Sequence, residues 1–353
     1  MQSSFSKKLL EWFDPDTRNL PWKKTNDAYK IWLSEIIMQQ TRVEQGTPYY
    51  LAFVKQYPTI KKLAAAPLDD VLKLWEGLGY YSRARNLHVA AKQVVELHKG
   101  KFPETHEEIL KLKGIGVYTA AAIASFAYNL PHAVVDGNVY RVLSRVFGIE
   151  TPTDTTIGKF TFQKLADDLL DKINASTYNQ AIMDFGALVC KPKQPLCNQC
   201  PFSSECVALV KNKIDLLPVK SKKLIKTERH FHYYVLYDND NIYLRQRNED
   251  DIWKGLFEFP MIETEQATED ASALLYKILK GKNNNLLPAN NQTFHFKQTL
   301  SHQYIHGYFH EFYFTKLPNP DKSYLKIKKQ DILNYAFPKI VRTYLENRLI
   351  FIS

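Results

Sequence analysis

Four cysteines lie within one short stretch of the 353-residue chain, at Cys190, Cys197, Cys200 and Cys206. The spacing Cys-x6-Cys-x2-Cys-x5-Cys lets one compact loop place four thiolates around a single centre. Both zinc and an iron-sulfur cluster accept four cysteine ligands. Zinc modules typically use two Cys-x2-Cys pairs, and this stretch has one, which favours the cluster and leaves zinc as the alternative.

Asp136 is the first of two carboxylates whose surroundings point to chemistry. It follows an apolar, strand-like entry in the segment AVVDGNVYRV and precedes a helical pattern. The sequence therefore predicts Asp136 at the N-cap, near the positive end of the helix, which should keep its carboxylate ionised. A purely structural cap is the alternative.

Glu35 is the second carboxylate, in the segment IWLSEIIMQQT. Helical spacing places it on the face that carries Ile31, Trp32 and Met38. Apolar neighbours raise the pKa of a carboxyl, so Glu35 should be able to hold a proton near neutrality. The alternative is a Glu hydrogen-bonded to Gln39 at the edge of the apolar stripe.

Two glycines, Gly114 and Gly116, form a tight hairpin between helical patterns in LKGIGVYTAAAI. Glycine at such a turn lets backbone N–H groups approach a phosphate oxygen at a helix N-terminus. An ordinary packing corner between two helices is the alternative.

The predicted secondary structure around these residues changes along the chain, from helices in the first part to strands in the second. Residues 1 to 210 are predicted as a helical catalytic domain, with apolar residues at spacings of three and four. Residues 211 to 228 are predicted as a basic linker, and residues 229 to 353 as an α+β domain. In the α+β domain, alternation of apolar and polar residues predicts strands at 231 to 237, 242 to 247, 293 to 297 and 304 to 315. Helices are predicted near 266 to 280 and 330 to 347, and an exposed loop at 281 to 292.

The chain carries a formal net charge of +10, which fits a polyanionic partner. Most of the excess lies in residues 1 to 228, with 31 Lys and Arg against 23 Asp and Glu. No run of eighteen apolar residues and no secretory leader is present, so we expect a cytoplasmic protein without membrane contact.

The hairpin LKGIGVYTA, the later segment VVDGNVYRV and the cysteine loop resemble the endonuclease III and MutY superfamily of DNA glycosylases in residues, order and separation. The resemblance is strong over residues 5 to 210 and moderate from 229 to 353. It implies a helix-hairpin-helix domain, a catalytic role for Asp136 and a structural [4Fe-4S] cluster that fixes a basic loop near DNA, with Lys191 and Lys193.

Tyr118 indicates which of the two reaction types of that superfamily to expect, base removal alone or base removal with strand cleavage. Members that also cut the strand carry a lysine two residues after the second hairpin glycine, where this chain has Tyr118. Without an amine nucleophile there, we expect hydrolytic release of the base with no efficient strand cleavage.

The segment LPWKKTNDAYKIWLSEIIMQQTRVEQ resembles the first catalytic segment of the MutY family of adenine DNA glycosylases, and Glu35 falls on that family's general acid. By resemblance, Glu35 protonates adenine N7, Asp136 stabilises the cationic sugar, and Tyr118 and Asn138 support them. Asp184 is expected to be a helix-packing polar residue, and a place beside the base pocket is the alternative.

Base extrusion needs residues that fill the gap in the duplex. By resemblance these are Gln39, Gln40 and Tyr80, the last within GLGYYSRARNLH. Arg83 and Arg85 in the same segment are expected to face phosphate.

The C-terminal segments WKGLFEFP and TLSH resemble weaker signatures of the MutY C-terminal domain, which is Nudix-like and recognises 8-oxoguanine. Ser301 and His302 are then expected to read the oxidised base. Leu300 stands where family members commonly have Phe and cannot stack as Phe does. The chain lacks an acidic Nudix helix of the REx2EE type, so diphosphate hydrolysis is not expected.

The sequence therefore predicts a monomeric, monofunctional, nucleoid-associated glycosylase acting on duplex DNA that contains adenine opposite 8-oxoguanine or guanine. Two alternatives stay open: a related glycosylase for another mispaired base, and a non-catalytic iron-sulfur DNA-binding protein.

Overall fold

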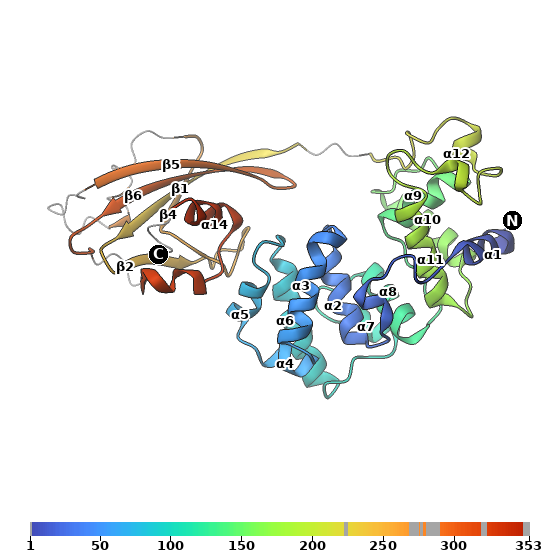
Figure 1. The fold of residues 1–353 in the computed structure, drawn as a ribbon, viewed down its shortest axis with the longest axis horizontal. Helices are drawn as coiled ribbons and strands as arrows, with labels where there is room; N and C mark the ends of the chain where they lie inside the picture. Colours follow the sequence, from blue (N-terminus) through green and yellow to red (C-terminus); the bar gives the residue numbers. More distant parts are fainter. Residues whose placement is uncertain are drawn as a thin grey trace. The chain divides into compact units, whose positions relative to one another are not determined.

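The chain forms two compact units in the computed structural model, which describes residues 2–221, 225–267, 275, 278–279, 290–318 and 323–348. One unit comprises Met1–Ala65 and Val89–Lys223, and the other comprises Ala66–His88 and Leu224–Ser353. The sequence placed residues 66 to 88 in the helical domain, whereas their contacts are mainly with the C-terminal unit. Figure 1 colours this segment blue to cyan.

The first unit is helical in its described part (Figure 1). Its elements are α1 (Gln2–Trp12), η1 (Pro21–Lys24), α2 (Ala28–Met38), α3 (Val43–Gln56), α4 (Ile60–Ala65), the later part of α6 (Ser82–Leu97), α7 (His106–Leu110), α8 (Val117–Tyr128), α9 (Gly137–Phe147), α10 (Thr156–Leu169), α11 (Ala175–Leu188), η2 (Cys197–Gln199) and α12 (Val207–Val210). No helix in the described part of the chain is both long and apolar enough to cross a membrane.

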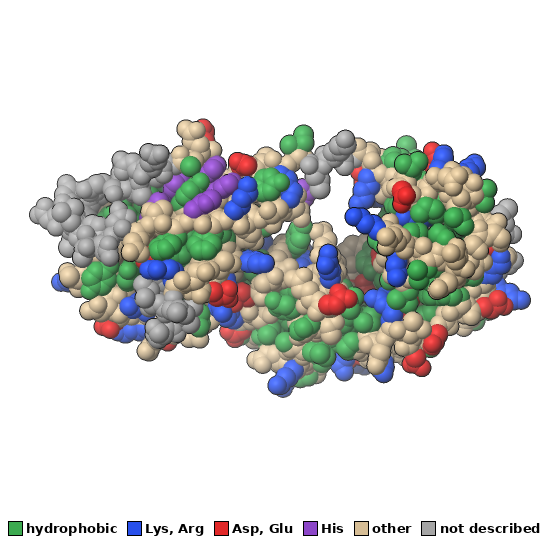
Figure 2. Space-filling model, turned by 45° about the horizontal axis from the view of Figure 1, so that its top comes forward, with side chains coloured by type: hydrophobic (Ala, Val, Ile, Leu, Met, Phe, Trp, Pro, Cys, Tyr) green, Lys and Arg blue, Asp and Glu red, His purple; other side chains and the backbone are tan. Residues whose placement is uncertain are grey.

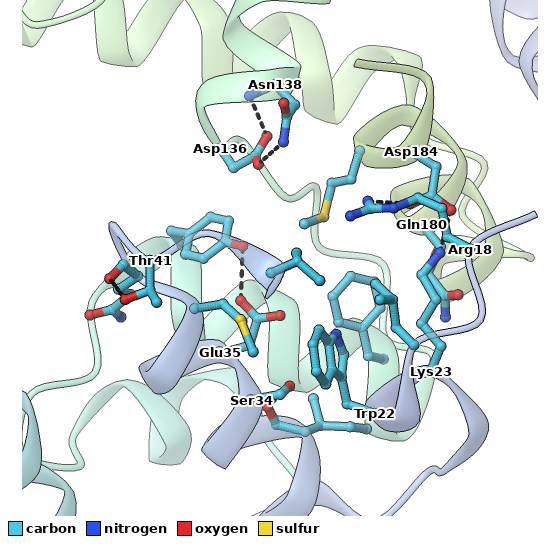
Figure 3. Close-up of a pocket in the computed structure, with 18 of the residues that line it drawn as sticks. Arg18, Trp22, Lys23, Ser34, Glu35, Thr41, Asp136, Asn138, Gln180 and Asp184 are labelled. Atoms are coloured by element: carbon cyan, nitrogen blue, oxygen red, sulfur yellow. Dashed lines mark hydrogen bonds and ion pairs between the residues drawn. The ribbon is translucent and has the colours of Figure 1, made fainter. Parts of the chain in front are cut away.

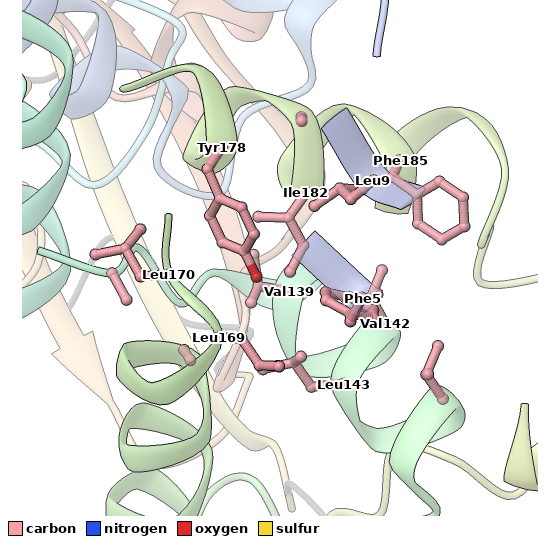
Figure 4. Close-up of a cluster of buried hydrophobic side chains, with 14 of the residues drawn as sticks. Phe5, Leu9, Val139, Val142, Leu143, Leu169, Leu170, Tyr178, Ile182 and Phe185 are labelled. Atoms are coloured by element: carbon pink, nitrogen blue, oxygen red, sulfur yellow. The ribbon is translucent and has the colours of Figure 1, made fainter. Parts of the chain in front are cut away.

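A buried apolar cluster holds α1, α9 and α11 together (Figure 4). Phe5 of α1, Val142 of α9 and Phe185 of α11 are each at most 3% exposed. Burying a side chain of this size contributes about 1.5–3 kcal/mol, so the cluster fixes the start of α9, where Asp136 lies.

Small residues bring α8 close to the chain that leads into α9. Ala121 and Ala122 of α8 pack against Val134, and α8 also packs against α2. Gly114 lies in the turn before α8 with φ of +79°, a conformation that glycine adopts without strain. These contacts bring α2, α8 and the start of α9 to one place in the first unit.

The second unit combines a mixed sheet with short helices. Its strands run in the order β3-β2-β1-β6-β5, and β1 pairs in parallel with β6 while the other pairs are antiparallel. The elements are α5 (Leu68–Leu74), the start of α6, β1 (Thr227–Tyr237), β2 (Asn241–Gln246), β3 (Phe257–Glu258), β4 (Met261–Thr264), β5 (Asn290–Thr299), β6 (Gln303–Tyr313), β7 (Leu325–Lys328), η3 (Lys329–Asn334) and α14 (Lys339–Glu346).

The predicted combination of a helical domain with an α+β domain is confirmed, with differences in detail. Strands β3, β4 and β7 were not predicted, because two to four residues are too few to show a period. The predicted loop at 281 to 292 ends early, since β5 begins at Asn290, and its other residues, like most of the helix at 266 to 280, lie outside the described residues.

Candidate active site and cysteine centre

A pocket of about 360 Å³ opens in the helical unit, among η1, α2, α8, α9 and α11 (Figure 3). Its lining includes Glu35, Tyr118, Asp136 and Asn138, the four residues that the sequence analysis assigned to catalysis. Figure 3 shows Glu35 on α2 and Asp136 at the start of α9 on different sides of the pocket. The fold thus brings together two carboxylates that lie about a hundred residues apart in the chain.

Glu35 accepts a hydrogen bond from the Tyr118 hydroxyl, with 2.8 Å between the phenolic oxygen and Oε2. Burial raises the pKa of the Glu35 carboxyl to about 7; the Tyr118 hydrogen bond opposes this shift and the nearby Asp136 charge adds to it. Glu35 can therefore be protonated near neutral pH and donate that proton. The Gln39 amide, the alternative partner of Glu35 in the sequence, donates to Thr119 Oγ1 at 3.2 Å.

Asp136 is the N-cap of α9, and its Oδ1 accepts from the backbone N–H groups of Asn138 and Val139 at 2.8 Å each. The Asn138 amide donates to Oδ2 at 2.7 Å. Burial raises the pKa of Asp136, while these hydrogen bonds and the Arg141 charge lower it and favour the carboxylate that the cap position predicts.

Arg141, one turn into α9, links Asn138 to the cysteine loop. Its guanidinium donates to Asn138 Oδ1 at 2.8 Å, to the Gly186 carbonyl at 2.7 Å and to the Cys190 carbonyl at 2.6 Å. Glycine is needed at position 186, because a Cβ there would lie 2.6 Å from the Asn138 Cβ. A chain of hydrogen bonds therefore runs from Cys190 to the Asp136 carboxylate.

The position of Asp184 also needs correction, because the structure places it in the pocket wall and not merely in helix packing. Its carboxylate is 2% exposed and forms ion pairs with Arg18, at 2.8 Å, and with Lys23. Burial lowers the pKa of Lys23, and the bond to Asp184 counters that effect. Asp184 thus fixes two cations at the pocket.

Sequence reasoning assigned no role to several other lining residues: Arg18, Trp22, Lys23, Gln180 and Met183. For α11 a signal existed, since Gln180, Met183 and Asp184 are spaced to share one helix face. For η1, a short basic and aromatic turn, we find no comparable pattern.

The expected DNA-contacting residues of the helical unit lie in two places. Gln39 and Gln40 line the same pocket, and Gln40 has φ of +54°. Gly116 is the residue before α8, and a Cβ added there would meet no atom of the described residues within 4 Å. The space beside Gly116 is therefore open to a ligand such as phosphate.

All four cysteines line one small cavity, together with Arg145. Arg145 is 2% exposed; it donates to the Lys191 carbonyl at 2.7 Å and lies 3.6 Å from Cys190 Sγ. A buried guanidinium beside sulfur stabilises negative charge there, so the residues fit an anionic thiolate-bound centre.

In the other unit, Tyr80, Ser301 and His302 line a pocket of about 480 Å³. The Tyr80 hydroxyl and Ser301 Oγ are hydrogen-bonded to each other, although 221 positions separate them. Arg83 packs over Trp75, 5.1 Å from the ring centroid, and Arg85 donates to the Lys254 carbonyl at 2.6 Å. The two arginines, which we expected to face phosphate, thus also make contacts inside this unit.

Comparison with known proteins decides the family. Residues 33–166 match the model of the HhH-GPD superfamily base excision DNA repair protein, and residues 232–347 match that of the NUDIX domain. The adenine DNA glycosylase of Buchnera aphidicola subsp. Acyrthosiphon pisum is 33% identical over 97% of each chain. The chain belongs to the adenine DNA glycosylase family.

The human adenine DNA glycosylase is 43% identical over 58% of this chain and 39% of its own length. Among solved structures, that of a thermostable thymine-DNA glycosylase covers 60% of the present chain and 97% of its own, with a TM-score of 0.55 and 29% identity. The structure of a trapped endonuclease III–DNA intermediate covers 60% of the present chain and 98% of its own, with a TM-score of 0.52 and 22% identity. At this identity the likeness supports the fold alone. The predicted family and the Nudix-like C-terminal fold are confirmed.

Proposed function

We propose that this protein removes adenine from duplex DNA by hydrolysing the N-glycosidic bond, with adenine opposite 8-oxoguanine or guanine as its substrate. The observation that carries the proposal is the pairing, in one pocket, of a Glu35 whose pKa is raised to about 7 with the hydrogen-bonded Asp136. Relatives named adenine DNA glycosylase support adenine as the base.

The two carboxylates divide the work of cleavage. The adenine is first extruded from the duplex into the pocket. Protonated Glu35 donates its proton to N7, the C1′–N9 bond breaks, and the electron pair leaves with the base. Asp136 stabilises the oxocarbenium-like sugar. Glu35, now a carboxylate, takes a proton from the water that attacks C1′, which restores the starting state.

Tyr118 keeps the reaction hydrolytic. Its phenol donates to Glu35 and offers no amine that could form a Schiff base with the sugar. The product is an abasic site in an intact strand. A Tyr118→Lys enzyme should instead yield some DNA adduct that borohydride traps.

The cysteine loop would hold a [4Fe-4S] cluster through Cys190, Cys197, Cys200 and Cys206. The convergence of the four thiols on one cavity beside Arg145 supports this assignment. Such a cluster, when bound, supplies a rigid and charged anchor for the loop and does not act on the base. Arg145 and Arg141 then hold the loop against α9.

Tyr80, Ser301 and His302 would read the base opposite the adenine. Their common pocket offers a hydroxyl pair and an exposed imidazole beside an aromatic ring, groups that suit the edge and face of an oxidised guanine. We place the enzyme, as a monomer, on chromosomal DNA in the cytoplasm.

The test is base release from duplexes that differ only in the base opposite a labelled adenine, followed by treatment with or without alkali. Strand breaks that need alkali, are fastest opposite 8-oxoguanine and are absent for Glu35→Gln support the proposal. Equal release from all duplexes, or cleavage without alkali, contradicts it. A duplex with thymine opposite guanine serves as the control for the related thymine-DNA glycosylase activity.

A further inference from the structure

Five of the ten histidines lie on one face of the C-terminal sheet, a feature that base excision does not use. Figure 2 shows histidine side chains in purple on the surface of this unit, beside lysine and acidic side chains. Parallel pairing places His230 beside His306, and antiparallel pairing places His295 beside Tyr308. The five members of this histidine face are His230, His232, His295, His306 and His310.

The inner part of the histidine face is closed. His232 and His310 are 0% and 3% exposed, and 3.0 Å separates His232 Nδ1 from His310 Nε2. The other ring nitrogen of His310 is 3.0 Å from Thr293 Oγ1. Burial lowers the pKa of both histidines to about 4, so this pair is neutral at physiological pH and its facing nitrogens are already engaged.

The outer part is open to solvent and has a different geometry. His295 is exposed, and its Nε2 lies 3.3 Å from Nδ1 of His306 on the neighbouring strand. A tetrahedral metal ion with metal–nitrogen bonds of about 2.0–2.1 Å sets two ligand nitrogens about 3.3–3.4 Å apart. The two imidazoles are hydrogen-bonded to each other, and a metal ion that replaced this bond would need little change in the separation of the two nitrogens.

The groups around His306 favour a bound cation and hold the ring in place. Glu228 places Oε2 3.9 Å from His306 Nε2. This separation is too long for a hydrogen bond, but the carboxylate adds negative charge beside the ring, which favours a cation. The His230 ring stacks on His306 at 4.8 Å between centroids and 15° between planes, which limits its rotation.

We infer that His295 and His306 bind a transition-metal dication such as Zn²⁺ or Ni²⁺ across β5 and β6, with water completing the coordination. Borderline cations are the ones that prefer imidazole nitrogen. The site is a two-histidine site, because no third His, Cys, Asp or Glu of the described residues is placed on the same ion. The ammonium group of Lys297, 4.0 Å from Glu228, opposes the cation and limits its affinity.

The test uses the iron-loaded full-length enzyme, dialysed to equilibrium against ZnCl2 at neutral pH, with zinc and iron both quantified by mass spectrometry. We expect a single zinc ion per chain without loss of iron, and a rise in Tm with zinc. His295→Gln and His306→Gln should each abolish both effects. His98→Gln, which lies outside this face, is the matched control and should retain them.

Two further variants change the charge beside the proposed metal site. Glu228→Gln should weaken zinc binding, because it removes a negative charge close to the site. Lys297→Gln should strengthen zinc binding. Zinc uptake that is unchanged in the His295 and His306 variants, or that rises only as iron is lost from the cysteine loop, would overturn the inference. His295 is exposed, so its variant should fold normally, which its circular dichroism spectrum and iron content will check.

Discussion

The Tyr118 phenol on α8 donates a hydrogen bond to Glu35 on the adjacent helix α2, with 2.8 Å between the two oxygens. Burial and the nearby acids raise the pKa of Tyr118 well above its ordinary value, so the phenol stays protonated and acts only as a donor here. A donated hydrogen bond favours the ionised carboxylate. Tyr118 therefore limits how far burial can raise the pKa of Glu35.

The rate of base release should fall as pH rises through about 7. The reaction needs a protonated Glu35, and the pKa of this group is raised to about 7. Single-turnover rates of adenine release between pH 5.5 and 9 measure the effect, with DNA in excess of Kd at every pH. A rate that stays constant up to pH 9 in the wild-type enzyme would contradict a Glu35 general acid.

Glu35→Gln should stabilise the folded protein at alkaline pH. Because the folded pKa is raised from 4.5 to about 7, the folded state binds the proton more tightly than the unfolded chain. The favourable contribution is fully present below pH 4.5 and is lost as pH rises to about 7. The substitution should therefore raise the free energy of unfolding by about 1–3 kcal/mol at pH 8 and have little effect at pH 4.5.

Chemical denaturation at the two pH values measures that difference. The matched control is Glu11→Gln, since the Glu11 side chain is exposed and should change stability little at either pH. An equal change at pH 4.5 and pH 8 would mean that Gln acts through packing and not through the lost ionisation.

Tyr118→Phe should move the alkaline limb of the rate profile to higher pH. The variant keeps the ring and removes the hydrogen bond that lowers the pKa of Glu35. Single-turnover profiles of the two enzymes give the apparent pKa values directly. Identical values would show that the phenol does not bear on Glu35 ionisation.

Each carboxylate of the pocket carried a local signal in the sequence, and the resemblance to known glycosylases supplied the roles predicted for them. Glu35 stands on an apolar helical face, and Asp136 stands where an apolar entry meets a helix. Local position does not reveal how deeply Asp136 is buried. A cap position indicates stabilisation of the anion, whereas its burial, which raises its pKa, depends on α11 and α8, which no local pattern reveals.

Contacts between residues far apart in the sequence could not be predicted either, because local patterns do not show them. Asp184 meets Arg18 and Lys23 across more than 160 positions, and Tyr80 meets Ser301 across 221. Each partner alone reads as an ordinary polar surface residue. The grouping of residues 66 to 88 with the C-terminal unit depends on such contacts too, including the bond from Lys73 to the Tyr335 carbonyl.

Asp184→Asn should weaken the substrate complex and lower the stability of the helical unit. The change leaves Arg18 and Lys23 without their shared counter-charge at a buried position. Breaking a buried pair in this way costs several kcal/mol. The Kd for adenine-containing duplex and the Tm measure the two effects, and Asp168→Asn, at an exposed position of α10, is the control. An Asp184→Asn enzyme with wild-type Tm and Kd would mean that the two cations need no anchor.

Arg141→Gln should slow base release while the iron held by the four proposed cysteine ligands is retained. Arg141 holds the Asn138 carbonyl oxygen, which leaves the Asn138 amide free to donate to Asp136. Without the guanidinium, that amide can rotate and the carboxylate loses a donor, so we expect a fall of about ten- to hundredfold in the single-turnover rate. Iron content and Kd for DNA should change much less than the rate.

Because Arg141 is itself buried, Asn138→Ala provides the independent check. It removes the donor to Asp136 but keeps the guanidinium bonds to the Gly186 and Cys190 carbonyls. A slow Asn138→Ala enzyme with full iron content locates the effect at Asp136. If instead only Arg141→Gln is slow, and its rate follows its iron content, then Arg141 acts by holding the cysteine loop and not by orienting the carboxylate.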